Sequence, residues 1–161
     1  MNLDTILDTI RNLALVTNLT DNGVNEGQSL IIDLSNDAFE EDSLDFTSEG
    51  KETWGKIVGL LSPVGISFFD YEANAGDVSH IFSVESGVST EESAAAFSLS
   101  PSEAWDRYVG DTTAEQWAGS GADPRAYCGL DGADTSPLVE SLSKPAREHV
   151  AGLLAVWVAK H

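Results

Sequence analysis

Apolar residues near the start of the chain recur with the period of an α-helix. Within residues 3–16 they lie three or four positions apart, at Leu3, Ile6, Leu7, Ile10, Leu13 and Ala14. Residues with this spacing share one face of a helix. The pattern therefore predicts an N-terminal helix with one buried face.

Three later segments alternate apolar and polar residues, which is the period of a β-strand. In the first, near residues 29–35, Leu30, Ile32 and Leu34 share one face. The other two, near residues 64–71 and 78–85, are joined by a short segment that contains Gly76. These two segments predict a β-hairpin in the middle of a sheet.

The first strand of this hairpin carries apolar side chains on both faces. Ile66 and Phe68 share one face, and Phe69 and Tyr71 share the other face with Ser67. On the second strand, one face holds Val78, His80, Phe82 and Val84, and the other holds Ser79, Ile81 and Ser83. A strand that is apolar on both faces is covered on both sides. Phe69, Tyr71 and Ile81 are therefore candidate interface residues, covered by helices of this chain or by another subunit.

A middle helix is predicted around Trp54 and Ile57, and it ends before Pro63 because proline cannot continue a helix. Beyond residue 85 the sequence favours helices. Three helix-start patterns occur there, in which serine or threonine precedes glutamate by three positions, at Ser89, Ser100 and Thr112. An irregular connection follows over residues 119–134, and Ser136-Pro137 predicts a further helical turn.

The last predicted helix begins at Ser143-Lys144-Pro145 and is apolar on nearly all sides. A helix of this kind is buried or shared with another chain. Val156 and Trp157 on this helix complete the candidate interface. The whole pattern predicts a single α+β domain over residues 1–161. Its small, largely antiparallel sheet is packed by an N-terminal helix, a middle helix and a helical C-terminal half.

The charge of the chain restricts its partners. Eight Lys and Arg residues stand against 27 Asp and Glu residues, for a net charge of −19 over 161 residues. Such a chain repels nucleic acid and anionic membranes, so neither is expected as a direct partner. An acid-rich, lysine-poor composition is also typical of proteins adapted to high salt, where screening weakens the repulsion between like charges. The alternative is an acidic protein from an ordinary salt environment.

Acidic residues are densest within residues 33–52, where Phe39, Leu44 and Phe46 lie among them. These apolar residues predict a loop that is pinned to the body of the protein. The candidate acidic surface consists of Asp37, Glu40, Glu41, Asp42 and Asp45. This surface either binds a basic partner or is a solvated loop that only increases solubility.

Candidate catalytic groups are few. Cys128 is the one cysteine, and a cysteine nucleophile needs a base such as His80 or His149 nearby. His80, held by Asp70 or Asp77, is a conceivable general base, but its position in phase with apolar neighbours favours a core or interface histidine. No phosphate-binding glycine motif, histidine pair or complete calcium loop is present, so no metal or cofactor is predicted.

These observations favour a non-enzymatic structural or protein–protein interaction subunit of a multi-protein assembly, for example of a virion type, with self-assembly as an alternative to other protein partners. A second hypothesis is an acidic decoy or immunity-type protein that binds a basic protein surface. A small hydrolase that uses His80 or Cys128 is the third. With neither a secretory signal nor an apolar run of membrane-spanning length, a cytoplasmic or particle-associated location is expected.

Overall fold

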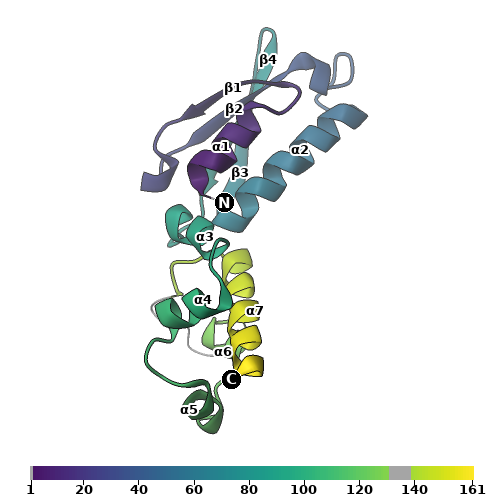
Figure 1. Cartoon of the computed structure of the whole chain (residues 1–161). Helices are drawn as coiled ribbons and strands as arrows, with labels where there is room; N and C mark the ends of the chain where they lie inside the picture. The colour runs from purple at the N-terminus through teal and green to yellow at the C-terminus, as the bar shows by residue number, and fades with distance from the viewer. Residues whose placement is uncertain (1, 131–138) are drawn as a thin grey trace.

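The computed structural model describes residues 2–130 and 139–161 and has an α+β fold, in which a four-stranded antiparallel sheet precedes a helical C-terminal half (Figure 1). The predicted fold class is confirmed. Part of the expected irregular connection, residues 131–134, and the expected helical turn at Ser136-Pro137 lie outside the described residues.

The first helix is shorter than the sequence pattern predicts. Helix α1 spans Leu3–Arg11, and the next element is strand β1, Val16–Asp21, which was not predicted. Leu15, between them, has a φ of 73° and so lies in the left-handed region, which a right-handed helix cannot include. Leu13 and Val16 still pack against the core. The extension of the helix to residue 16 was therefore wrong, although Leu3, Ile6, Leu7 and Ile10 do face inward.

Three more strands complete the sheet: β2 (Leu30–Ser35), β3 (Ile66–Asn74) and β4 (Asp77–Val84). The strand order is β1-β2-β4-β3, and every neighbouring pair is antiparallel. The predicted hairpin is therefore confirmed as β3 and β4. It occupies one side of the sheet, with β3 at the edge, rather than its middle.

A β-bulge changes which side chains of β3 share a face. The register shifts between Phe68 and Asp70, so Phe68 lies opposite Phe82 and Tyr71 lies opposite His80. Residues directly opposite each other in an antiparallel pair share a face. The prediction that Phe69 and Tyr71 share a face was therefore wrong, because the bulge at Phe69 moves Tyr71 to the face of Phe68.

Helices α1 and α2 (Ser48–Leu61) cover one face of the sheet (Figure 1). They bury Ile6, Ile10, Ile57 and Leu61 against the strands, where alternate residues of β2 are buried. Three short 3₁₀ helices connect these elements: η1 (Val24–Glu26), η2 (Asn36–Ala38) and η3 (Ser62–Val64). This arrangement explains the period-two pattern of β2 and the helical pattern of α1.

The helical half contains α3 (Thr90–Ala96), α4 (Pro101–Tyr108), α5 (Ala114–Gly119), α6 (Pro124–Tyr127) and α7 (Lys144–Lys160). Ser89, Ser100 and Ser143 cap α3, α4 and α7, as their patterns predict. The third start lies one residue later than expected. Thr113 caps α5 and pairs with Gln116, which can replace glutamate in a capping box.

The described residues form two separate apolar clusters. One joins the sheet to α1 and α2, and the other joins α4 to α7 around Trp105, Trp117 and Leu154. The hydroxyl of Ser143, the residue that caps α7, links the halves by donating a hydrogen bond to the Pro63 carbonyl, and the Ser143 amide donates to Ser93 Oγ of α3 at 2.9 Å. The prediction that residues 1–161 form a single domain stays a prediction. None of the helices described is long and apolar enough to span a bilayer.

Candidate protein-interaction groove

An aromatic cluster lies where the loop of residues 36–47 meets the sheet. Phe39 and Phe46 form an isolated antiparallel bridge that closes the loop, and their rings stack with centroids 5.0 Å apart. The Glu40 amide donates a hydrogen bond to the Asp45 carbonyl at 2.8 Å, which strengthens this closure. Phe39 is also buried in the core beside the sheet and Phe46 packs against that core, so the predicted pinning of the loop to the body is confirmed for these two phenylalanines. Leu44, the third expected anchor, is 46% exposed.

Helix α2 brings Trp54 into contact with this loop and with the hairpin. The Trp54 ring lies 5.5 Å from Phe46, 5.1 Å from Phe68 and 4.8 Å from His80, measured between centroids. Tyr71 completes the series at 6.5 Å from His80. Aromatic rings at these separations attract one another.

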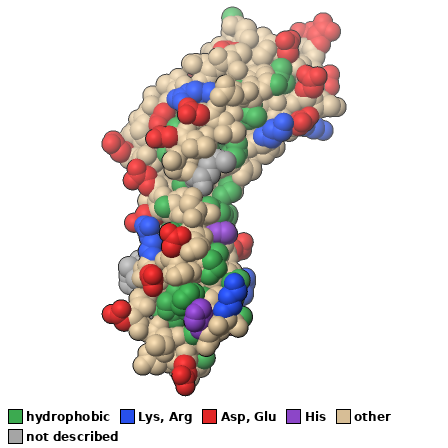
Figure 2. Space-filling model, in the orientation of Figure 1, with side chains coloured by type: hydrophobic (Ala, Val, Ile, Leu, Met, Phe, Trp, Pro, Cys, Tyr) green, Lys and Arg blue, Asp and Glu red, His purple; other side chains and the backbone are tan. Residues whose placement is uncertain are grey.

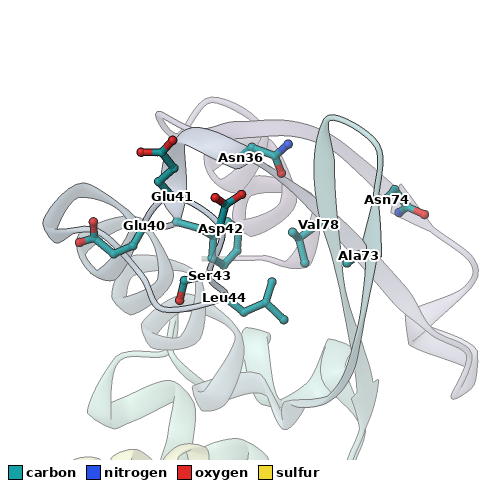
Figure 3. Close-up of a pocket in the computed structure, with 10 residues that line it drawn as sticks. Asn36, Glu40, Glu41, Asp42, Ser43, Leu44, Ala73, Asn74 and Val78 are labelled. Carbon is teal, nitrogen blue, oxygen red and sulfur yellow. The ribbon is translucent and has the colours of Figure 1, made fainter.

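Two adjoining hollows lie over this cluster. A hollow of about 470 Å³ is lined by apolar and aromatic side chains: Phe39, Leu44, Phe46, Trp54, Phe68, Tyr71, Val78 and His80. A second, of about 670 Å³, shares Phe39, Leu44 and Val78 with the first and extends toward the hairpin tip at Asn74. We call the two together the aromatic groove. Figure 3 shows the loop on one side of it and the hairpin tip on the other, with Leu44 and Val78 between them.

The rim of the aromatic groove is acidic. Glu40, Glu41 and Asp42 line the larger hollow, and all three side chains are exposed. No Lys or Arg occurs between Lys56 and Arg107, so the hairpin supplies no cation to neutralise them. Acidic groups gather at the sheet end of the molecule, although others are spread over its surface (Figure 2). The groove therefore combines an apolar floor with a strongly negative rim.

His80 lies at the centre of the aromatic cluster and is 5% exposed. Its Nδ1 atom makes no hydrogen bond within the described part of the chain, and burial lowers the pKa of the ring below its usual 6.5. The nearby Val78 backbone and the Asp33 carboxylate oppose this effect on the pKa without cancelling it. The imidazole is therefore neutral near pH 7, as an uncharged ring among aromatic side chains.

We expect the neutral state of His80 to make folding sensitive to acid. The unfolded chain takes up a proton near pH 6.5, whereas the folded chain does so only at lower pH, so stability falls as the pH drops below 6.5. Urea unfolding midpoints at several pH values between 7.5 and 5 measure this loss. His80→Phe keeps an aromatic ring and removes the titration, so it should show a smaller loss over the same range. An equal loss in both proteins would contradict this role of His80.

The candidate interface residues do not lie together. Tyr71 lines the groove and Phe69 is the bulge residue beside it, 62% exposed, whereas Ile81 lies on the opposite face of the sheet, paired with Asp70 and Ile31. Val156 and Trp157 belong to α7 in the helical half. Because α7 is apolar on nearly all sides, part of its apolar surface stays uncovered, and Val156 is 41% exposed. The ring of Trp157 stacks on the ring of His161.

The predicted acidic surface is exposed along one loop. Asp37 lies in η2, Glu40, Glu41 and Asp42 follow it, and Asp45 comes before α2.

Sequence reasoning did not identify Phe68 and Trp54 as part of a groove beside this loop. The signal that was available is the set of aromatic residues at 39, 46, 54, 68 and 71, which lies within and just after the acidic segment.

Two of the groups proposed for catalysis, Cys128 and His80, are buried in different clusters. Cys128 is completely buried in the helical half, whereas His80 belongs to the aromatic cluster beside the sheet. Burial raises the pKa of the Cys128 thiol to about 11, although Arg147 opposes the shift. The thiol is therefore protonated at neutral pH, which is the unreactive form of cysteine.

No group of three or more metal-ligating side chains is found within residues 2–130 and 139–161. Comparison of the chain with protein-family models, with curated proteins and with solved structures finds no match. The interpretation of the groove therefore depends on its geometry and charge.

Proposed function

We propose that this protein is a non-enzymatic interaction subunit whose aromatic groove binds a segment of another protein that carries lysine or arginine. The observation that carries the proposal is the combination of exposed Glu40, Glu41 and Asp42 with an aromatic hollow of about 470 Å³ beside them. Aromatic side chains are enriched at the centres of protein interfaces, and polar groups at their rims. The groove has both features.

A basic side chain suits this site for two physical reasons. A lysine or arginine over the face of Trp54 or Tyr71 is attracted by the ring, because the face of an aromatic ring is negative. The acidic rim adds a longer-ranged attraction that speeds association and weakens as salt increases. The methylene groups of the same side chain can pack on Leu44 and Phe68 while the charge reaches the rim.

The same features support an acidic decoy or immunity-type protein as a second candidate. Such a protein blocks a basic surface that normally binds another anionic molecule, and the concentration of acids on the loop of residues 36–47 favours it. The two candidates differ in the result of binding, because a decoy inhibits its partner and an assembly subunit does not. In both cases, adaptation to high salt would account for the acids that lie away from the groove.

Reversal of the rim charge tests the proposal. We expect Glu40→Lys, Glu41→Lys and Asp42→Lys together to weaken binding of the synthetic peptide Lys-Phe-Lys-Val-Lys-Phe-Lys-Val by about tenfold or more at low salt, because three attractions become repulsions. The affinity is measured by isothermal titration calorimetry, at peptide concentrations where light scattering shows the peptide alone to be monomeric.

A matched control separates the local effect from the effect of net charge. Asp106, Asp111 and Glu115 are exposed in the helical half, and their replacement by lysine changes the net charge by the same amount. This control should retain most of the affinity. Equal losses in the two triple variants, or no binding by the unmodified protein, would refute a specific role for the groove rim.

A further inference from the structure

We infer that the bound segment adds to the sheet as a fifth strand, alongside the free edge of β3, with one alternate set of its side chains facing the aromatic groove and its acidic rim and the other set facing Asp70 and Glu72 on the opposite side. This inference rests on the proposed function and specifies the conformation of the partner. It follows from the position of β3, from the exposure of its side chains and from the charges on its two faces.

Strand β3 is a free edge of the sheet. It is the last strand in the sheet order, and within the described residues it pairs with β4 alone. Its residues 68–74 are all exposed, and the strand contains no proline, lysine or arginine. Natural proteins usually protect such an edge with these residues, because unpaired backbone groups recruit another strand. Phe69 and Tyr71 also leave apolar surface exposed here, at 62% and 50%.

The other edge of the sheet has a different character. Strand β1 is six residues long, its exposed positions are polar, and its pairing with β2 is interrupted between Val16 and Asn18. A short and polar edge is a poor template for another strand. The bulge in β3 lies near its start, and its pairing with β4 is regular from Asp70 to Asn74. The docking edge is therefore β3.

The two faces of β3 determine which side chains the added strand needs. Phe68 and Tyr71 lie on the groove side, opposite Phe82 and His80, whereas Asp70 and Glu72 lie on the other side, opposite Ile81 and Ser79. Side chains of neighbouring strands meet on the same face. An added strand therefore places one alternate set of residues beside Phe68 and Tyr71 and the other set beside Asp70 and Glu72. Apolar residues suit the first set, as does a lysine whose methylene groups pack on the rings while its charge reaches the acidic rim, and lysine or arginine suits the second set.

A second copy of this chain is a poorer occupant of the edge. Two β3 strands side by side would bring together the carboxylates of Asp70 and Glu72 from both copies, with no lysine or arginine on either strand to neutralise them. Like charges on neighbouring strands are unfavourable, and each copy carries a net charge of −19. Charge complementarity therefore favours a basic segment of another protein.

Selective methylation of the peptide backbone tests the strand geometry. In a β-strand, alternate residues direct their backbone N–H groups toward the same neighbour, so only every second N–H of an added edge strand faces β3. The peptide Lys-Phe-Lys-Val-Lys-Phe-Lys-Val is made in two N-methylated forms, one methylated at Phe and Val and the other at Lys. Both keep every side chain and every charge. We expect one form to lose about tenfold or more in affinity, because several backbone hydrogen bonds are lost, and the other to stay within about threefold of the unmethylated peptide.

The possible results are distinct. If the two methylated forms bind with equal affinity, whether or not that affinity is lower than that of the unmethylated peptide, the inference of an added strand is overturned. The proposed function still stands in that case if the triple lysine variant of the protein binds the unmethylated peptide more weakly than the unmodified protein does. No binding by the unmethylated peptide overturns both the inference and the proposed function. A stable dimer of the unliganded protein in light scattering that Tyr71→Lys dissociates would assign the edge to a second copy and overturn the inference.

Discussion

Replacement of Gly50 by alanine is expected to destabilise the protein by about 1–3 kcal/mol or more, because a Cβ atom at this position has no space. It would lie 2.0 Å from the carbonyl oxygen of Ala38 and 3.0 Å from the ring of Phe46. The backbone oxygen cannot move aside as a flexible side chain does. The first turn of α2 would have to separate from the loop that carries Glu40 to Asp42, so the acidic rim should be displaced as well.

Gly55 provides the matched control for Gly50. It lies in the same helix and is exposed, and a Cβ atom added there would meet no atom within 4 Å. Alanine at this position should therefore stabilise the protein by about 0.5–1 kcal/mol, because alanine is the better helix former. Urea unfolding of the two variants measures both effects. Similar changes of the same sign would contradict the close contact between α2 and η2.

Phe82→Ala is expected to cost about 3–5 kcal/mol, which is a large share of the stability of a domain of this size. The Phe82 side chain is 1% exposed and contacts Trp54 and Phe68, with ring centroids at 5.5 Å and 5.7 Å. Its removal leaves a cavity under the floor of the aromatic groove. Peptide binding should weaken as well, because Trp54 and Phe68 lose the ring that supports them.

Phe69, on the partner strand, is the control for Phe82. It is 62% exposed at the bulge, so Phe69→Ala should change the free energy of unfolding by less than about 0.5 kcal/mol. Thermal or urea unfolding distinguishes the two phenylalanines directly. A loss for Phe69→Ala as large as that for Phe82→Ala would mean that the face assignment along β3 is wrong.

The sequence predicted the elements whose residues follow a simple period. The alternation in β2 and β4 and the serine caps of α3, α4 and α7 are local signals, and the structure contains each of them. Strand β1 was not predicted because only Leu19 within it is buried, so it has no period-two pattern. Its place at the edge of the sheet depends on pairing with β2, a long-range contact that composition does not reveal.

The site was only partly predictable for a similar reason. The acidic loop and its two phenylalanine anchors are evident from residues that are close in sequence. The contact of Trp54 with Phe68 and His80 requires a helix to fold back over the hairpin, and the position of Tyr71 depends on a one-residue bulge. A bulge reverses the faces of every later residue in a strand. No feature of residues 66–74 alone indicates where the bulge lies.

The central claim is that a basic segment binds in the aromatic groove, and the tryptophan indoles test it most directly. Of the four tryptophans, Trp54 alone lines the groove, and the others lie in the helical half at positions 105, 117 and 157. In a ¹⁵N-labelled sample titrated with Lys-Phe-Lys-Val-Lys-Phe-Lys-Val, the indole N–H signal of Trp54 should shift while the other three stay in place. A titration that shifts the signals of the helical half and leaves Trp54 unchanged, or that shifts none, would contradict the account.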